Sequence, residues 1–229
     1  MKIVIDKRDN ILQQAAKLIS DTVSAKPDCA IAFAAGETLK QVYSELANNP
    51  TASFSGCKAF NVTEYVGLET DKNGCASELY EELYSKLGIS EVHTPGAENF
   101  ESYDDEIAAA GGIELAVLGI GTNGHIGFNE PATLYDTHTH IAKLTDKTKA
   151  MKAERFGGVE NVPDEAYTMG LKTLCSARNV ILCAFGEEKA DVVYNLVYGK
   201  TSTYIPAAML QMHMNMTLLL DEAAGAKLD

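Results

Sequence analysis

The chain is poor in basic side chains. Its 229 residues contain 19 Lys and Arg against 32 Asp and Glu, which gives a formal net charge of −13 at pH 7. No stripe of Lys or Arg interrupts this acidity, so nucleic acid and anionic membranes are excluded as partners. A phosphorylated ligand would have to be held by a few local cations and backbone N–H groups against an unfavourable overall field.

Long apolar runs and paired cysteines are also missing. No run approaches the roughly 18 residues of a membrane span, and the opening MKIVIDKRDN has no signal-peptide pattern. We therefore expect a soluble cytoplasmic protein. The cysteines are odd in number and lack any C-x-x-C pair, which argues against a disulfide framework and a zinc site. They are expected to be mostly small core residues: Cys29, Cys57, Cys75, Cys175 and Cys183.

Strand-like and helix-like segments alternate along the chain. Short apolar runs predict strands at Lys2–Ile5, Ala30–Ala34, Cys57–Val62, Ile113–Leu118, Asn179–Phe185 and Met216–Leu220. Between them, apolar residues recur at helical spacing, as in Ile11, Ala15, Ile19 and Val23. A further helix is expected over Ser77–Leu87, after a polar connection at Glu69–Gly74. With 46% hydrophobic residues, the pattern predicts one α/β domain over residues 1–229: three layers, doubly wound, with a mostly parallel sheet. Such sheets hold ligands at the carboxyl ends of their strands.

One segment, LGIGTNGHIGFNEP from Leu118 to Pro131, carries most of the functional information. An apolar run ends there in a bend whose glycines permit positive φ and close approach to a ligand. The bend contains His125 and Glu130, whose imidazole and carboxylate can move protons. The segment is typical of a catalytic loop.

The same segment, together with FNVTEYVGL at Phe60–Leu68, closely resembles the glucosamine-6-phosphate deaminase (isomerase) family, which is related to the 6-phosphogluconolactonases. Further matches are AFAAGETLKQVYSEL from Ala32, ERFGG around Arg155, GEEKA around Lys189 and IPAAMLQMH from Ile205. The resemblance implies a substrate of the hexosamine 6-phosphate class, ring opening, a proton shift between C2 and C1, and release of ammonia. It implies no metal or redox cofactor, and it leaves a homo-oligomer open.

The resemblance assigns roles to individual residues of the loop. His125 matches the ring-opening histidine, and a histidine near its reference pKa of about 6.5 performs this task with little tuning. Glu130 is expected to hold the second imidazole nitrogen and favour the protonated form. Asn123 is expected to hydrogen-bond the sugar, and Gly124 and Glu64 are further expected substrate-binding residues.

Three well-separated segments are expected to converge on the phosphate. The N–H groups of the turn formed by Ala35, Gly36, Glu37 and Thr38 would bind it at a helix N-terminus, with the Thr38 hydroxyl. The Arg155 guanidinium and the Lys189 ammonium would supply the charge.

The sequence departs from the family at the expected C2 base. Thr63 occupies the position of an aspartate in the family's FN-x-D-EYVGL motif, and a hydroxyl cannot replace that carboxylate. If Phe60–Glu64 is extended, the neighbouring Glu64 points to the opposite face, so it is not a simple substitute.

Other departures touch the phosphate loop and the sugar contacts. Glu37 replaces a small residue, and its carboxylate must turn outward, pair with Lys40, or mark a substrate without that phosphate. Cys75 and Ala76 replace a Ser-Tyr pair, and Lys172 replaces a small residue and is expected to offset Glu37. These changes suggest a divergent member with altered substrate or chemistry.

Three functions are carried forward from the sequence. The first is an amino-sugar-phosphate deaminase or isomerase for the glucosamine or galactosamine epimer. The second is a lactonase-like hydrolase, and the third is a sugar-phosphate binder without activity. The H-x-H pair of His138 and His140 is interpreted as part of a partly exposed strand rather than a metal site, and Met209–Met216 as core filling.

Overall fold

A fully parallel seven-stranded sheet forms the centre of the computed structural model, which describes residues 1–68 and 71–228. Its strand order is β1 (Lys2–Asp6), β10 (Met216–Asp221), β9 (Asn179–Ala184), β6 (Ile113–Gly119), β2 (Ala30–Phe33), β3 (Lys58–Asn61) and β5 (Glu91–His93). The six strands expected from the sequence are confirmed to within a residue or two, and β5 is the addition at one edge.

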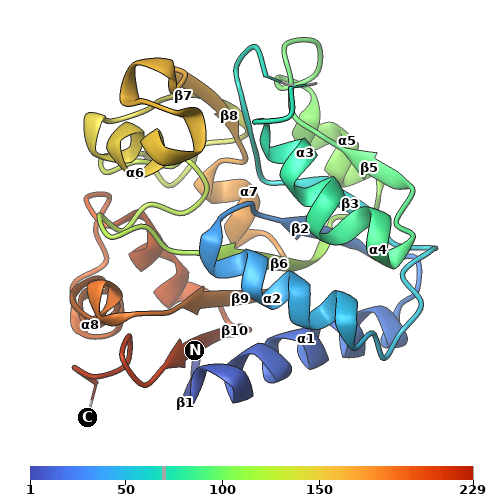
Figure 1. Cartoon of the computed structure of the whole chain (residues 1–229), viewed down its shortest axis with the longest axis horizontal. Coiled ribbons are helices and arrows are strands. Elements are labelled where there is room, and N and C mark those ends of the chain that lie inside the picture. Colours follow the sequence, from blue (N-terminus) through green and yellow to red (C-terminus); the bar gives the residue numbers. More distant parts are fainter. Residues whose placement is uncertain (69–70, 229) are drawn as a thin grey trace.

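Helices cover both faces of this sheet. On one face, α1 (Arg8–Ala25) and α2 (Glu37–Asn48) pack against each other and against the central strands (Figure 1). Right-handed crossovers place α5 (Tyr103–Ala109) and α8 (Ala190–Tyr198) on the opposite face. The expected apolar stripe of α1 is buried, since Ile11, Ala15 and Ile19 have no exposed surface. The doubly wound α/β class is therefore confirmed.

The chain changes direction across the sheet between β2 and β6. After β2 it runs outward through β3 to β5, and it then returns to β6, next to β2, before continuing to β9 and β10. The loops that leave β2 and β6 consequently diverge and open a crevice at the carboxyl ends of the two strands. In open parallel sheets this is the position where ligands bind.

A second, antiparallel sheet lies at this end of the molecule, and the sequence predicted only the partly exposed strand around His138 and His140, which begins at His140. It consists of β4 (Thr63–Tyr65), β8 (Glu165–Thr168) and β7 (His140–Lys143) in that order, with α6 (Asp146–Phe156) and η2 (Val159–Asn161) between β7 and β8. A small apolar cluster that includes Tyr65, Phe128 and Ala166 holds it together. The strands span three or four residues and α6 buries only Thr148, so neither gives a hydrophobic period long enough to detect.

A single helical segment follows the loop after β4. It contains α3 (Cys75–Leu79), a π-helical turn η1 (Tyr80–Tyr84) and α4 (Ser85–Leu87) without a break, in place of the uniform helix expected over Ser77–Leu87. Helix–helix contacts join η1 to α2. The polar connection expected at Glu69–Gly74 begins with residues 69 and 70, which lie outside the described residues.

The remaining elements complete the second helical layer. They are α7 (Leu171–Cys175), η3 (Glu187–Lys189) and η4 (Pro206–Met212). The interpretation of the methionine run as core is wrong for half of it: Met209 and Met216 are buried, whereas Met212 and Met214 are exposed, because η4 ends at Met212 and the chain turns on the surface before β10.

Four of the five cysteines are buried and the fifth is half-buried, and all five are free thiols, as expected. Within the described ranges, every helix is too short or too polar to cross a bilayer.

Gly170 fixes the junction between the small sheet and α7. A Cβ at this position would come within 2.0 Å of the Thr137 carbonyl oxygen and 2.2 Å of the His138 carbonyl oxygen. We predict that Gly170→Ala lowers the free energy of unfolding by about 2 to 3 kcal/mol, because backbone on both sides must shift. Gly119→Ala is the matched control: its Cβ would meet no atom closer than 3.9 Å. Urea unfolding measures both, and equal stability of the two variants would contradict the prediction.

Candidate active site

A cavity of about 220 Å³ opens at the carboxyl ends of β2 and β6, where the chain reverses its direction across the sheet. Backbone of both diverging loops lines it, and β4, α3, α6 and η3 contribute side chains. The lining residues used below are Ala35, Gly36, Glu37, Thr38, Thr63, Cys75, Glu78, Gly121, His125, Lys152, Arg155 and Lys189. The expected catalytic and phosphate-binding segments therefore converge on one site.

His125 lines this cavity from the glycine-rich loop after β6. The backbone folds tightly around the ring, since Gly121 N donates to the His125 carbonyl oxygen over 2.9 Å. A Cβ at Gly121 would lie 2.3 Å from the imidazole Cε1, so a side chain at this position would displace the ring. Only 12% of the His125 side chain is exposed, and Nδ1 is buried without a hydrogen-bond partner in the described structure.

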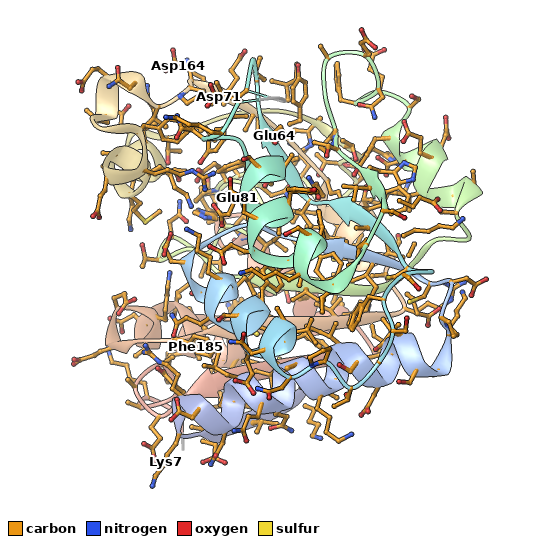
Figure 2. All side chains as sticks on the ribbon, turned by 45° about the vertical axis from the view of Figure 1, so that its right-hand side comes forward. Lys7, Glu64, Asp71, Glu81, Asp164 and Phe185 are labelled. Atoms are coloured by element: carbon orange, nitrogen blue, oxygen red, sulfur yellow. The ribbon has the colours of Figure 1, made fainter. Side chains whose placement is uncertain are left out.

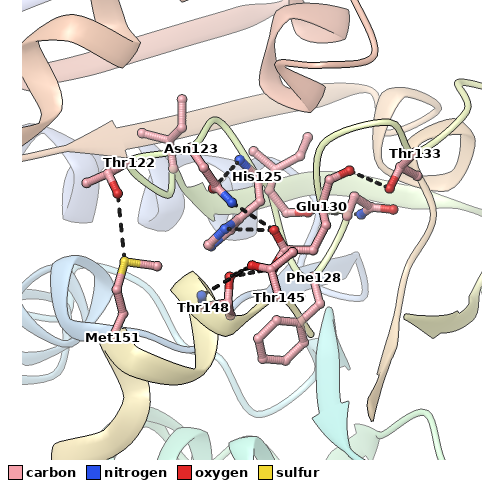
Figure 3. A network of polar contacts seen from close by, with 12 residues as sticks. Thr122, Asn123, His125, Phe128, Glu130, Thr133, Thr145, Thr148 and Met151 are labelled. Atoms are coloured by element: carbon pink, nitrogen blue, oxygen red, sulfur yellow. Dashed lines mark hydrogen bonds and ion pairs between the residues drawn. The ribbon is translucent and has the colours of Figure 1, made fainter. Parts of the chain in front are cut away.

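Glu130 connects the loop to α6 (Figure 3). Its carboxylate accepts hydrogen bonds from Asn123 Nδ2 over 2.8 Å and from the Thr148 hydroxyl in the first turn of α6. Asn123 also accepts from the His125 backbone N–H through Oδ1, over 3.2 Å. Neither Asn123 nor Glu130 lines the cavity, and both organise the loop around His125.

The expected effect of Glu130 on His125 needs correction. Glu130 Oε2 lies 3.9 Å from His125 Nδ1, within ion-pair range but too far for a hydrogen bond. The pKa of His125 is lowered to about 3, because burial disfavours the imidazolium and the ammonium groups of Lys152, Lys189 and Lys147 repel it. The imidazole is thus neutral at pH 7, and the expectation of a histidine near its reference pKa is wrong.

Thr63 faces the cavity, whereas Glu64 does not, as the alternation along an extended strand requires. The Thr63 hydroxyl donates to Cys75 Sγ over 3.4 Å, and burial raises the pKa of that thiol to about 12. Neither group is a base at pH 7.

Glu64 and Gly124 have structural roles instead of the expected contact with the substrate cavity. Glu64 is fully buried at the start of α3 (Figure 2), where its carboxylate accepts from the N–H groups of Tyr65, Cys75 and Ala76 over 2.7 to 2.8 Å. The Gly124 carbonyl oxygen accepts from Ala207 N over 2.9 Å and holds η4.

The turn that was expected to bind phosphate leads into α2, and Glu37 takes two of the arrangements considered for it. Its side chain is 85% exposed and pairs with Lys40 over 3.3 Å. Lys172 does not offset Glu37. Its ammonium contacts His138 Nε2 over 3.1 Å, and Asp104 holds His138 Nδ1 over 3.1 Å at a separate surface site. In the described residues no group of three or more His, Cys, Asp and Glu side chains is placed to bind a metal ion.

Arg155 reaches the cavity, but its guanidinium is engaged by Glu78, a residue that the sequence analysis did not identify. One Glu78 oxygen pairs with Arg155 Nη1, and the other accepts from Gly36 N over 2.8 Å. Arg155 Nη2 also donates to the Gly74 carbonyl oxygen over 2.8 Å. The Glu78 side chain is 5% exposed. A chain carboxylate thus sits where an anionic ligand was expected.

Two further cations face the cavity. Lys189 Nζ donates to the Ile120 carbonyl oxygen over 2.9 Å, which fixes it beside the His125 loop, and burial lowers its pKa. Lys152, one helical turn before Arg155 on α6, was also missed by the sequence analysis. Its spacing of three residues from Arg155, which places both on one helix face, is the signal that could have identified it.

The depressed pKa of His125 predicts a pH dependence of stability. The unfolded chain binds a proton at this histidine below about pH 6.5, while the folded chain stays neutral down to a pKa of about 3. Stability is therefore lost as the pH falls below about 6.5, by about 1.4 kcal/mol per pH unit. Between about pH 6.5 and 4.5 we expect the wild type to lose about 2 to 3 kcal/mol more than His125→Asn. Urea unfolding across this range measures it, and parallel curves would contradict it.

Comparison with known proteins agrees with this geometry. A family model described as glucosamine-6-phosphate isomerases/6-phosphogluconolactonase matches residues 6–219. A glucosamine-6-phosphate deaminase from Halalkalibacterium halodurans is 37% identical in an alignment of 240 positions, which covers 99% of this chain and 98% of that relative.

Solved structures give the same result. A structure described as a monomeric glucosamine-6-phosphate deaminase has a TM-score of 0.95 and 30% identity, covering 99% of both chains. The 6-phosphogluconolactonase of Trypanosoma brucei has a TM-score of 0.80 at 18% identity, covering 100% of this chain and 98% of that one, which shows a common fold alone. The chain belongs to the glucosamine-6-phosphate isomerase/6-phosphogluconolactonase family.

Proposed function

We propose that this chain is an amino-sugar-phosphate isomerase and deaminase, which converts a hexosamine 6-phosphate and water into a ketose 6-phosphate and ammonia. The observation that carries the proposal is a neutral His125 lining a cavity that also presents Lys152 and Lys189. Family membership supports the reaction class. The five free thiols agree with a reducing, cytoplasmic site of action.

Ring opening is the step for which the site is best equipped. A neutral imidazole can accept the proton of the anomeric hydroxyl and return it to the ring oxygen, which breaks the bond between C1 and that oxygen. The imidazole packs directly against the Gly121 backbone, which limits its movement on that side. Asn123 and Glu130 act as positioning residues that hold the loop.

The later proton shift from C2 to C1 is poorly provided for. The carboxylates that line the cavity in the described structure are Glu37, which is turned outward to Lys40, and Glu78, which is held by Arg155 and Gly36. Thr63 supplies a neutral hydroxyl at the expected position of the base. We therefore infer that turnover is slow and that the C2 step limits it. The proposed substrates are glucosamine 6-phosphate and its galactosamine epimer.

The same observation favours a second candidate, a sugar-phosphate-binding homologue without turnover. Binding and ring opening need no carboxylate base at C2, so a chain with Thr63 retains them. Ammonia release distinguishes the two candidates.

His125 is predicted to be essential for turnover. With glucosamine 6-phosphate or galactosamine 6-phosphate, a coupled assay for ammonia and ketose phosphate is expected to give a rate that His125→Ala lowers about a hundredfold or more. His140→Ala, outside the cavity, is the control and should match the wild type. Absence of ammonia from both substrates would overturn the proposed reaction and favour the binding homologue.

Restoring a carboxylate at position 63 is predicted to accelerate the reaction. Thr63→Asp is expected to raise kcat about a hundredfold, the usual contribution of a positioned general base. Thr63→Asn has the same shape without the basic oxygen pair and should stay near the wild-type rate. Equal rates for the two variants would show that Thr63 does not limit the C2 step.

A further inference from the structure

A second group of charged side chains lies outside the active-site cavity, between α5 and α7. His138 is at its centre: Nδ1 lies 3.1 Å from Asp104 Oδ1, and Nε2 lies 3.1 Å from Lys172 Nζ. None of these three residues, the His138 cluster, lines the cavity at the ends of β2 and β6. The proposed deaminase reaction uses none of them, so their arrangement needs its own explanation.

The two contacts of the His138 ring determine which nitrogen carries the hydrogen. An ammonium group only donates hydrogen bonds, so Nε2 accepts from Lys172. A carboxylate only accepts them, so Nδ1 carries the hydrogen and donates to Asp104. In this tautomer a carboxylate orients an imidazole whose other nitrogen faces a nucleophile, as in a catalytic triad. The nucleophile position is occupied here by the amine of Lys172.

Asp104 is a firmly held partner for the ring. Its Oδ2 accepts from Thr139 N over 2.8 Å, and its Oδ1 accepts from the Thr173 hydroxyl. Burial alone would raise the pKa of this carboxyl, but the hydrogen bonds from Thr139, Thr173 and His138 outweigh burial and lower the pKa. Asp104 is therefore ionised at pH 7, and its carboxylate is fixed in place before it meets the imidazole.

The His138 cluster borders a cavity of its own, of about 350 Å³. Asp104, His138 and Lys172 supply polar groups to its lining. Its apolar lining is made of Ile107, Ala108, Ile113 and Ala177. An apolar surface of this kind favours the hydrocarbon part of a ligand. The Lys172 side chain is exposed, so a reagent from solution can reach the amine.

We propose that Lys172 is a modification site: its amine takes the acyl group of an activated acyl donor, with His138 as the proton acceptor and Asp104 as a positioning residue. The donor class is a small carboxylic acid joined to a good leaving group, as in an acyl phosphate or a thioester. The hydrocarbon part of the acyl group lies against the apolar lining of the cavity. This reaction is independent of the proposed deaminase activity.

Acyl transfer removes two protons from the Lys172 ammonium. The first passes along the hydrogen bond to His138 Nε2 and from there to water, which leaves a neutral amine. The amine nitrogen then forms a bond to the acyl carbon, and the bond from that carbon to the phosphate oxygen or the thioester sulfur breaks with its electron pair. The leaving group takes the second proton. Asp104 stabilises the imidazolium while His138 carries the first proton.

The test measures acylation of individual lysines by mass spectrometry after brief exposure of the full chain to acetyl phosphate. Lys172 is expected to react about tenfold or more faster than Lys200, an exposed lysine that does not line this cavity, because a positioned proton acceptor accelerates such a step. His138→Ala is expected to bring Lys172 to the rate of Lys200. His140→Ala is the matched control and should leave the Lys172 rate unchanged, since the His140 ring contacts the His138 carbonyl oxygen over 2.8 Å.

Two results with acetyl phosphate and acetyl-coenzyme A would overturn the inference. The first is equal rates at Lys172 and Lys200 with both donors. The second is a Lys172 rate that His138→Ala leaves unchanged. Acceleration with either donor supports the inference, and the donor that gives it identifies the leaving group, phosphate or thiol.

Two further measurements separate proton acceptance from a structural role. Imidazole added to His138→Ala is expected to restore acylation of Lys172, because it supplies the missing acceptor, and no effect of imidazole would count against the inference. Asp104→Asn keeps the side-chain shape, but its amide can donate to Nδ1 and move the ring hydrogen to Nε2. This variant is expected to slow Lys172 about tenfold and to change the tautomer seen in the nitrogen NMR spectrum of His138. An altered tautomer with the wild-type acylation rate would contradict the positioning role of Asp104. Thermal unfolding checks that each variant is folded.

Discussion

The buried ion pair between Glu78 and Arg155 is the contact on which the geometry of the site depends. It joins α3 to α6 and, through Gly36 N, both of them to the start of α2. Removing one partner of such a pair typically costs about 3 to 5 kcal/mol, because it leaves a buried charge without compensation. The ion pair and the packing of apolar side chains both hold the walls of the cavity in place. The packing contribution comes from the small apolar cluster under the three-stranded sheet.

The cavity has a local charge opposite to that of the whole protein. The chain carries a net charge of −13, yet Lys152, Arg155 and Lys189 meet at one crevice and Glu78 balances only one of them. The low-dielectric walls strengthen this local field relative to the screened surface charges. Burial first, and this field second, lower the pKa of His125, so the anion binding and the proton transfer that we propose for the site are coupled.

Much of the fold and part of the site could be predicted from the sequence. The buried strands gave continuous apolar runs, and His125, Thr63 and the phosphate loop lie at strand ends where a parallel sheet collects them. The strands of the second sheet are too short to show a detectable alternation of apolar and polar residues. The roles of Glu78 and Lys152 depend on residues that are distant in the sequence, because tertiary folding brings both side chains to the cavity. The sequence predicted that Glu130 would favour the protonated form of His125, whereas the pKa of His125 is lowered. Burial and three lysines from α6 and η3 outweigh the nearby Glu130, and the local sequence motif shows neither the burial nor the lysines.

The π-helical turn at Tyr80–Tyr84 determines which way the side chains of α3 face relative to those of the helical residues that follow it. Each residue advances an α-helix by about 100°, so shortening this turn by one residue would rotate Cys75 and Glu78 away from the cavity while Leu83 and Tyr84 stay in the core. The set of side chains that line the crevice therefore depends on the presence of one residue in this turn. An insertion or deletion within Tyr80–Tyr84, which contribute no side chain to the cavity, would therefore exchange one set of cavity side chains for another.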